Sequence, residues 1–334
     1  MKVCICGGGN LGHVIAGFVS AQHPFEVSVF TRHPERWQQE LIVETPEGTA
    51  LTGKLADVTS DARQAVTGAD VVLLCLPGYA IREMLCEIRE YLTPSTAVGS
   101  VVSSTGFFFV ADEVLPPSIP IFGFQRVPFI ARIIDYGRHA RLMGYKDRLH
   151  VAIEHTENKE KTRRTLELML KTPVSLLQSH YEASLSNSNP LLHPSRLYDL
   201  WSDWHEGLFY EREPLFYEEW TERAAQLYID MDSELQRLLR VLPVRSGSIP
   251  TVLDYYESHD AVSLAAKLRS IEAFKGIKAP MRLTAGGYVP DFGSRYFVED
   301  FPYGLSFIHQ LMHAKGIPSP TIDRVLAWGL TTRL

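Results

Sequence analysis

Residues 2–19 read Lys2-Val-Cys-Ile-Cys-Gly-Gly-Gly-Asn-Leu-Gly-His-Val-Ile-Ala-Gly-Phe-Val19, and this stretch decides the fold. Its first residues are mostly apolar and predict a buried strand, and residues 14–19 have the composition of a helix packed on a sheet. Between them, Gly7, Gly9 and Gly12 form the pattern G-x-G-x-x-G. Glycine turns are common in α/β proteins, but a turn placed between a strand and a helix indicates dinucleotide binding.

Each glycine of this turn has its own task. Gly7 allows the tight turn, Gly9 lets the backbone approach a pyrophosphate, and Gly12 lets helix and strand pack closely. Free N–H groups and the positive end of the helix dipole then hold the phosphates. His13, which follows the last glycine, either contacts a phosphate or caps the loop. The residues expected to bind cofactor here are Gly7, Gly9, Asn10, Leu11 and Gly12.

The tip of the next strand bears on the choice of cofactor. Residues 25–30 alternate like a strand and continue into Thr31, Arg32 and, one turn later, Arg36. NAD-specific folds carry an acid at this tip, roughly 20 residues past the glycines, for the ribose 2′-hydroxyl. No carboxylate stands at the Thr31-Arg32 tip, and two guanidiniums suit a 2′-phosphate. The tip favours NADP(H), with NAD(H) kept as the alternative.

The bulk composition is that of a soluble globular enzyme. With 334 residues the chain is too long for one compact core, and its 45% hydrophobic and 22% charged residues are ordinary values. A net charge of −6 argues against a general nucleic-acid or membrane-surface role. No apolar run approaches the roughly 18–20 residues of a spanning helix. With four cysteines and no export signal visible, we expect a cytoplasmic location.

Strands alternate with helices across the first 155 residues. Apolar runs predict strands at residues 70–76, 97–102 and 119–124, and helical spacing predicts a helix at residues 80–91. This alternation predicts a doubly wound, mostly parallel α/β sheet of the Rossmann type. Ligands of such sheets lie outside the carboxyl ends of the strands. The loops that follow the strands therefore add Leu76 and Pro77 as cofactor contacts and Gln125 as a substrate contact.

The pattern changes to helices and loops in the second half of the chain. Residues 216–242 carry apolar side chains along one stripe and predict the longest helix, which stops at Pro243. Almost no strand pattern follows residue 181, so we expect an all-α domain. The predicted domains are a dinucleotide-binding domain at 1–180 and a helical substrate domain at 181–334. Exposed aromatic residues of the helical domain allow a homodimer without requiring one.

Two segments of this domain carry groups suited to proton transfer and anion binding. His193 lies between prolines after a run of Ser and Asn, and imidazole suits acid–base chemistry near neutral pH. Arg295 and Asp300 lie in an aromatic-rich block, where an Asp would orient a histidine and an Arg would clamp a carboxylate. An incidental histidine explains the first segment equally well, and composition alone favours a surface loop of paired charges for the second. His309 and His313 lack the acid of a zinc helix, so no metal site is predicted.

Several blocks in order give the chain a resemblance to a known family. The opening Lys2-Val-Cys-Ile-Cys-Gly-Gly-Gly-Asn10, the segment Asn189-Pro-Leu-Leu-His193-Pro, Asp232-Ser-Glu-Leu235, Lys278-Ala-Pro280 and Arg295-Tyr-Phe-Val-Glu-Asp300-Phe-Pro-Tyr-Gly304 resemble those of octopine/nopaline (opine) dehydrogenases. That family joins a Rossmann domain to a helical domain of the 6-phosphogluconate dehydrogenase C-terminal-like kind. The similarity extends over nearly the whole chain.

The resemblance implies an NAD(P)H-dependent reductive condensation of an amino acid with a 2-keto acid, in which hydride reduces an imine. By position, it implies that His193 is the acid/base, that Asp300 orients it, and that Arg295 binds the keto-acid carboxylate or helps hold the pair. We also expect Gln125 and Asn189 to contact the substrate. The chain is shorter than many members of the family, and its Thr31-Arg32 tip differs from NAD-using relatives.

Two other functions remain open at this point. A 2-keto-acid reductase resembling ketopantoate reductase would share the architecture, but that family uses a lysine on its first helical-domain helix. No lysine occurs between residues 172 and 266 of this chain. A non-catalytic NADP-binding sensor is the second alternative, against which the presence of His193, Arg295 and Asp300 argues.

Overall fold

The computed structural model describes residues 1–104 and 106–331. Contacts within the chain divide it into two compact units, Met1–Ser186 and Asn187–Leu334. The boundary expected between residues 180 and 181 falls at the first turn of helix α6 (His180–Leu185), which packs against strand β11 in the first unit.

An eight-stranded sheet forms the centre of the first unit, in the order β12-β11-β8-β7-β6-β1-β2-β5. Its neighbouring strands are parallel except β8 and β11, which pair antiparallel. The chain builds outward from β1 in one direction and then returns to build in the other, which confirms the predicted doubly wound sheet. The strands are β1 (Lys2–Cys6), β2 (Glu26–Phe30), β5 (Asp57–Thr59), β6 (Val71–Leu74), β7 (Ala97–Ser100), β8 (Ile121–Phe124), β11 (Leu149–Glu154) and β12 (Val174–Leu176).

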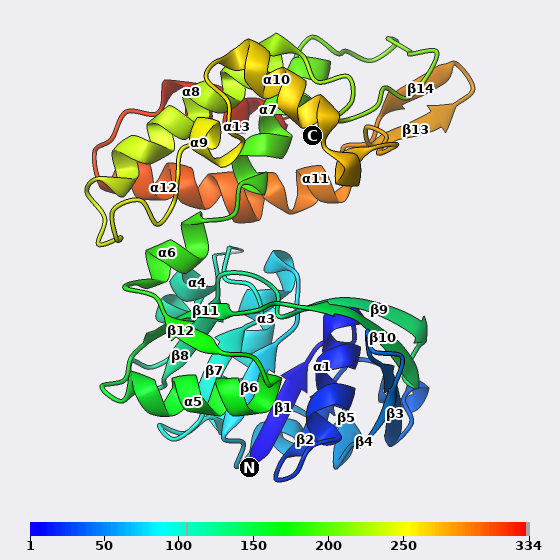
Figure 1. Cartoon of the computed structure of the whole chain (residues 1–334), viewed down its shortest axis with the longest axis vertical. Helices are drawn as coiled ribbons and strands as arrows, with labels where there is room; N and C mark the ends of the chain where they lie inside the picture. The colour runs from blue at the N-terminus through cyan, green and yellow to red at the C-terminus, as the bar shows by residue number, and fades with distance from the viewer. Residues whose placement is uncertain (105, 332–334) are drawn as a thin grey trace. The chain divides into compact units, whose positions relative to one another are not determined.

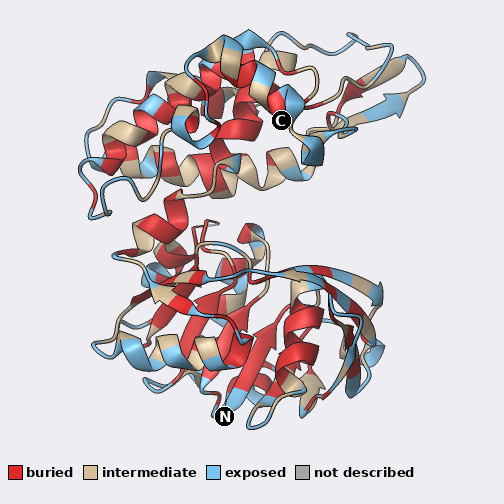
Figure 2. Cartoon of the chain, viewed as in Figure 1, coloured by how far each residue is buried: buried red, intermediate tan, exposed pale blue. Residues whose placement is uncertain are grey.

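The helices of this unit cover the sheet and bury its apolar strands. Figure 2 shows β1, β6 and β7 almost wholly buried, as the continuous apolar runs of parallel strands require. The helices are α1 (Asn10–Ser20), α2 (Ala62–Val66), α3 (Gly78–Ile88), α4 (Phe107–Val114) and α5 (Lys159–Leu170), with short 3-10 turns η1 (Pro34–Arg36) and η2 (Arg89–Tyr91).

A second sheet, which the sequence did not predict as a unit, packs on the other side of α1 (Figure 1). Its order is β4-β3-β10-β9, and β3 pairs with β10 across about a hundred residues of chain. The close approach depends on Gly17 of α1, because a Cβ there would meet Val43 Cγ2 at 2.5 Å. The strands are β3 (Glu40–Glu44), β4 (Ala50–Lys54), β9 (Phe129–Asp135) and β10 (His139–Tyr145).

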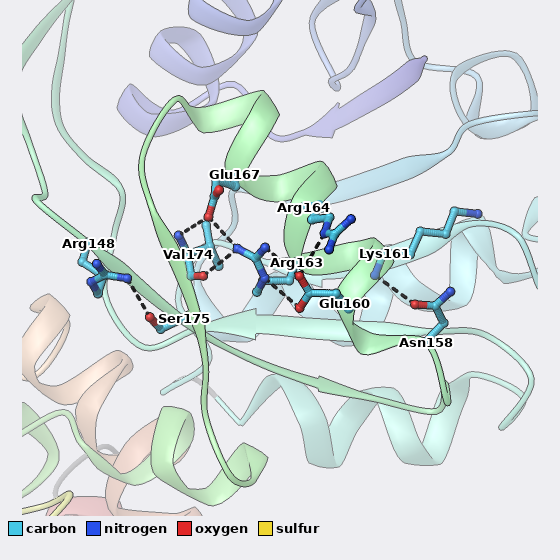
Figure 3. A network of polar contacts seen from close by, with 9 residues as sticks. All are labelled: Arg148, Asn158, Glu160, Lys161, Arg163, Arg164, Glu167, Val174 and Ser175. Carbon is cyan, nitrogen blue, oxygen red and sulfur yellow. Dashed lines mark hydrogen bonds and ion pairs between the residues drawn. The ribbon is translucent and has the colours of Figure 1, made fainter.

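Helix α5 is tied to the edge strand β12 by side chains rather than by apolar packing alone (Figure 3). Arg163 donates to the carbonyl oxygen of Val174 at 3.0 Å, and Glu167 accepts the N–H of Val174 at 2.9 Å. Arg163 also pairs with Glu160 at 2.7 Å, and hydrogen bonds from Arg163 and then Arg164 lower the pKa of Glu160 to about 2. The charged helix expected at residues 159–169 therefore also anchors the end of the sheet.

The second unit is mostly helical, as predicted, with its longest helix shorter than expected. Helix α8 begins after Thr221, whose hydroxyl accepts the N–H of Ala224 at 3.0 Å. Residues 216–220 therefore lie before the helix, although they continue its apolar spacing. The helices are α7 (Asn189–Trp201), α8 (Glu222–Leu239), α9 (Val252–Tyr255), α10 (Ala261–Ser270), α11 (Arg295–Val298), α12 (Ser306–Ala314) and α13 (Pro320–Thr331), with a 3-10 turn η3 (Glu272–Phe274) and a π-helical turn η4 (Phe301–Leu305).

A two-stranded hairpin corrects the expectation that every regular element of this unit is a helix. Strands β13 (Met281–Thr284) and β14 (Gly287–Pro290) pair antiparallel. Gly287 has φ +127°, a left-handed value that favours glycine at the turn. Each strand has only four residues, and Gly-Tyr-Val-Pro of β14 does not alternate, so the hairpin is too short and irregular to be predicted from its apolar pattern.

Candidate active site

The glycine turn has the geometry of a pyrophosphate cradle. Gly7 has φ +114°, and a Cβ there would meet the carbonyl oxygen of Cys75 at 2.7 Å. A Cβ on Gly12 would collide with the carbonyl oxygen of Gly7, so α1 and β1 pack closely only with glycine. A Cβ on Gly9 would point into open space, and α1 begins directly after it without a side-chain cap. The free first-turn N–H groups fit a bound phosphate.

A cavity of about 380 Å³ opens from this turn at the carboxyl ends of β1, β2 and β6. This volume is within the usual range for small-molecule sites. It gathers the predicted Gly7, Gly9, Thr31, Arg32, Leu76 and Pro77. The sequence did not predict its other lining residues, which include Tyr79, Glu83, Glu87 and Tyr136. Tyr136 lies in the turn between β9 and β10 of the second sheet. The sequence did not predict this sheet, so it could not predict that Tyr136 lines the cavity.

The remaining predicted cofactor residues are not among those that line this cavity. The guanidinium carbon of Arg36 lies 4.3 Å from the centre of the Tyr136 ring, a cation–π contact. Leu11 packs against the apolar core. The side-chain oxygen of Asn10 accepts the N–H of Ile133 at 2.9 Å, so it fastens α1 to β9.

His13 supports the turn from behind. Its Nε2 accepts the N–H of Gly137 at 2.7 Å, so Nδ1 carries the proton and donates to the carbonyl oxygen of Gly9 at 3.1 Å. The ring stacks on Trp37 with centroids 4.1 Å apart. Burial lowers the pKa of His13, and both hydrogen bonds suit the neutral imidazole. Of the two roles expected for His13, the structure shows the loop cap.

The second unit holds His193 in a hydrogen-bonded pair with Asp300. Nδ1 of His193 donates to Oδ2 of Asp300 at 2.7 Å, and the two side chains are 10% and 18% exposed. Nε2 lies 2.9 Å from the hydroxyl oxygen of Tyr217, and the edge of the Tyr296 ring packs against the imidazole at 4.5 Å. A carboxylate behind Nδ1 fixes the tautomer and favours an imidazolium, which is the arrangement of a general acid/base.

Close backbone packing brings these two distant residues together. Gly304 in η4 lies against α7, where a Cβ would meet Pro190 Cγ at 2.7 Å. Phe301 of η4 packs against Gly329 of α13, where a Cβ would collide with the Phe301 ring. Glycine at positions 304 and 329 therefore lets η4 sit against α7 and place Asp300 beside His193.

Each of the other predicted substrate residues has contacts of its own. Arg295 has an 85% exposed side chain that pairs with Glu299 at 3.3 Å, and no contact links it to His193. Asn189 opens α7, and its N–H donates to the side chain of Asn187. Gln125 belongs to the first unit, where its N–H donates to the carbonyl oxygen of His150 at 2.9 Å. Their substrate roles stay predictions.

Neither a metal site nor a membrane span emerges from the part of the chain that the structure describes. Within residues 1–104 and 106–331, no three His, Cys, Asp or Glu side chains are arranged to hold a metal ion. None of the helices described is both long and apolar enough to cross a bilayer. His309, considered above for zinc, pairs with Asp323 at 3.3 Å.

Comparisons with known proteins agree with both units. Residues 176–332 match the model of the NAD/NADP octopine/nopaline dehydrogenase alpha-helical domain, and residues 2–103 match that of the NADP oxidoreductase, coenzyme F420-dependent. The opine dehydrogenase of Haliotis discus hannai is 28% identical, over 98% of this chain and 89% of its own. The tauropine dehydrogenase of Arabella iricolor is 29% identical, over 97% and 89%. Residues 176–332 therefore belong to the octopine/nopaline dehydrogenase family.

A solved structure of an octopine dehydrogenase with NADH and L-arginine supports the same family. It has a TM-score of 0.87 and 26% identity to this chain, covering 99% of this chain and 89% of the other. The protein is an NAD(P)-dependent oxidoreductase of the opine dehydrogenase kind, acting on CH–NH groups. Its partners are a nicotinamide cofactor and small-molecule substrates. The sensor alternative does not fit this membership.

Proposed function

We propose that this opine dehydrogenase joins the amine of an amino acid to a 2-keto acid and reduces the resulting imine. The observation that carries the proposal is the 2.7 Å hydrogen bond between His193 and Asp300 in a chain of this family. Octopine dehydrogenase structures with L-arginine and with pyruvate support an amino acid and a 2-keto acid as the substrate classes.

The glycine turn and the cavity beside it would hold the nicotinamide cofactor, which supplies hydride when bound. Before the reaction His193 carries the proton as an imidazolium, which the carboxylate of Asp300 stabilises. His193 gives up this proton as hydride adds to the substrate. Arg295, exposed on α11, offers a guanidinium fork that matches a substrate carboxylate.

For the cofactor we propose a preference for NADP(H). Arg32 lines the cavity at the tip of β2, and Arg36 is oriented by the ring of Tyr136. Two guanidiniums attract a 2′-phosphate, whereas Glu83 and Glu87 on the α3 wall of the same cavity oppose it. Arg32 and Arg36 follow the strand whose tip binds the ribose, so we expect their attraction for a 2′-phosphate to exceed the repulsion from the two glutamates.

Replacement of the histidine tests the proposed reaction. We expect His193→Gln to lower kcat by roughly 10²–10⁴ and to leave cofactor affinity unchanged, because acid–base catalysis contributes about this factor. His309→Gln is the matched control, because His309 also pairs with an Asp in the second unit but at the surface. A loss of cofactor binding equal to the loss of kcat would remove the assigned role.

A simple 2-keto-acid reductase is the alternative that steady-state kinetics separates. It would oxidise NADPH or NADH with a keto acid alone, whereas the proposed reaction needs the amine as well.

A further inference from the structure

Both ring nitrogens of His193 already have protein partners. Nδ1 is hydrogen-bonded to Asp300 at 2.7 Å and Nε2 to the hydroxyl of Tyr217 at 2.9 Å. Each imidazole nitrogen makes one hydrogen bond in the plane of the ring. The nitrogen that would serve the substrate therefore faces a phenol, and a proton can leave His193 only through Tyr217 or after Tyr217 has moved.

The Tyr217 ring is held too firmly to move easily. It stacks on Phe274 with centroids 4.1 Å apart and an interplanar angle of 20°, and on Trp220 at 5.9 Å and 11°. Stacked aromatic pairs of this kind stabilise a ring beyond the burial of its apolar area. Swinging the ring away from His193 would break both stacks.

The backbone beside Tyr217 is fixed by the helix that carries His193. Arg196, one turn after His193 on α7, donates from Nε to the carbonyl oxygen of Phe216 at 3.0 Å. Arg196 is 1% exposed, and Asp199 accepts from its guanidinium at 3.0 Å. A buried guanidinium without hydrogen-bond partners is costly. Moving the backbone at Phe216 away from α7 would remove one of the partners of Arg196, so the segment around Tyr217 stays against α7.

The phenol is suited to pass a proton without becoming charged. Burial, followed by the nearby hydroxyl of Tyr296, raises the pKa of Tyr217 well above its ordinary value. A phenolate is therefore costly here, and the hydroxyl releases its proton only while it receives another. His193 is the group in place to supply it.

We propose that Tyr217 is a catalytic residue that relays the proton between His193 and the substrate. This inference rests on the proposed function, in which His193 is the acid/base. In the reductive direction the O–H bond of Tyr217 breaks and its proton joins the substrate nitrogen or oxygen, as hydride brings an electron pair to the adjacent carbon. The Nε2–H bond of the imidazolium breaks at the same time and restores the phenol. His193 ends neutral, and Asp300 remains a carboxylate.

The test is a double-mutant cycle with His193→Gln, Tyr217→Phe and the double variant. We expect Tyr217→Phe to lower kcat by roughly 10²–10³, within the range for acid–base catalysis, with KM changed little. If the two residues act in series in one relay, removing either one stops proton transfer. The double variant should then be no slower than His193→Gln. Tyr198→Phe, on the outer part of α7 against Trp328, is the matched loss of a hydroxyl and should keep wild-type kcat.

The remaining outcomes separate the relay from the proposed function. Full activity of Tyr217→Phe beside a slow His193→Gln would overturn the relay and leave His193 as the direct donor. A higher kcat or lower KM in Tyr217→Phe would make Tyr217 a gate, which also overturns it. Losses that multiply in the double variant would show that Tyr217 acts structurally. Full activity of His193→Gln would overturn the proposed function itself. Urea unfolding of every variant, followed by circular dichroism, establishes that the second unit is folded.

Discussion

Replacing Asp300 by Asn tests the pairing at the centre of the second unit. The variant keeps the size of the side chain and an oxygen that can accept from Nδ1 of His193, but it removes the negative charge 2.7 Å away. A hydrogen bond to a charged group contributes about 1.5–3 kcal/mol, against about 0.5–1.5 kcal/mol for a neutral one. Both side chains are largely buried, at 10% and 18% exposed, so solvent screens this difference little.

Because the side-chain oxygen of Asn still accepts a neutral hydrogen bond, the expected loss is only the difference of about 1–1.5 kcal/mol, a decrease of roughly 5–12-fold in kcat at about 1.4 kcal/mol for each factor of ten. The assay is steady-state oxidation of NADPH with saturating amino acid and keto acid, with cofactor affinity measured by fluorescence. Asp323→Asn is the control, because Asp323 pairs with His309 at 3.3 Å at the surface. Equal kcat for Asp300→Asn and wild type would refute the argument that this carboxylate stabilises the imidazolium.

Three further predictions concern the cofactor, the glycine turn and the long helix. Arg32→Ala should weaken NADPH by roughly 10-fold or more and NADH little, since a charge-assisted hydrogen bond contributes about 1.5–3 kcal/mol; equal losses in binding titrations would remove the 2′-phosphate argument. Burial lowers the pKa of His13, so the unfolded state binds more protons as the pH falls through about 6.5 and stability declines. Urea unfolding at pH 7.5 and 5.5 should therefore show a smaller loss for His13→Gln than for wild type, and an identical loss would contradict a buried neutral imidazole. Thr221→Ala should cost about 1 kcal/mol of unfolding free energy through the lost cap of α8, with Thr221→Ser close to wild type in the same urea assay.

The local features of this chain were readable from its sequence because they depend on neighbours. The strand, glycine turn and helix around Gly7 follow from composition and spacing over about twenty residues, and the structure gives each glycine a steric reason. The position of Arg32 at the tip of β2 followed in the same way.

The features that the sequence missed depend on contacts between distant segments. The predicted helix of residues 216–242 includes Tyr217, but in the structure the cap at Thr221 starts α8 and leaves residues 216–220 outside it. The hydrogen bond of Tyr217 to His193 arises from a loop whose path no periodicity describes. Tyr136 reaches the cofactor cavity from a sheet whose strands pair across about a hundred residues. The pairing of His193 with Asp300 was expected from family resemblance, and spacing alone left it undecided.

The most direct test of the central claim is a substrate matrix with the purified protein. NADPH and NADH oxidation would be followed with pyruvate, 2-oxoglutarate or oxaloacetate, each with and without a panel of amino acids, and the product would be identified by mass. The proposed reductive condensation predicts oxidation that needs both partners and a product whose mass is that of an N-(carboxyalkyl) amino acid. Oxidation at the same rate with a keto acid alone, giving a 2-hydroxy acid, would contradict it.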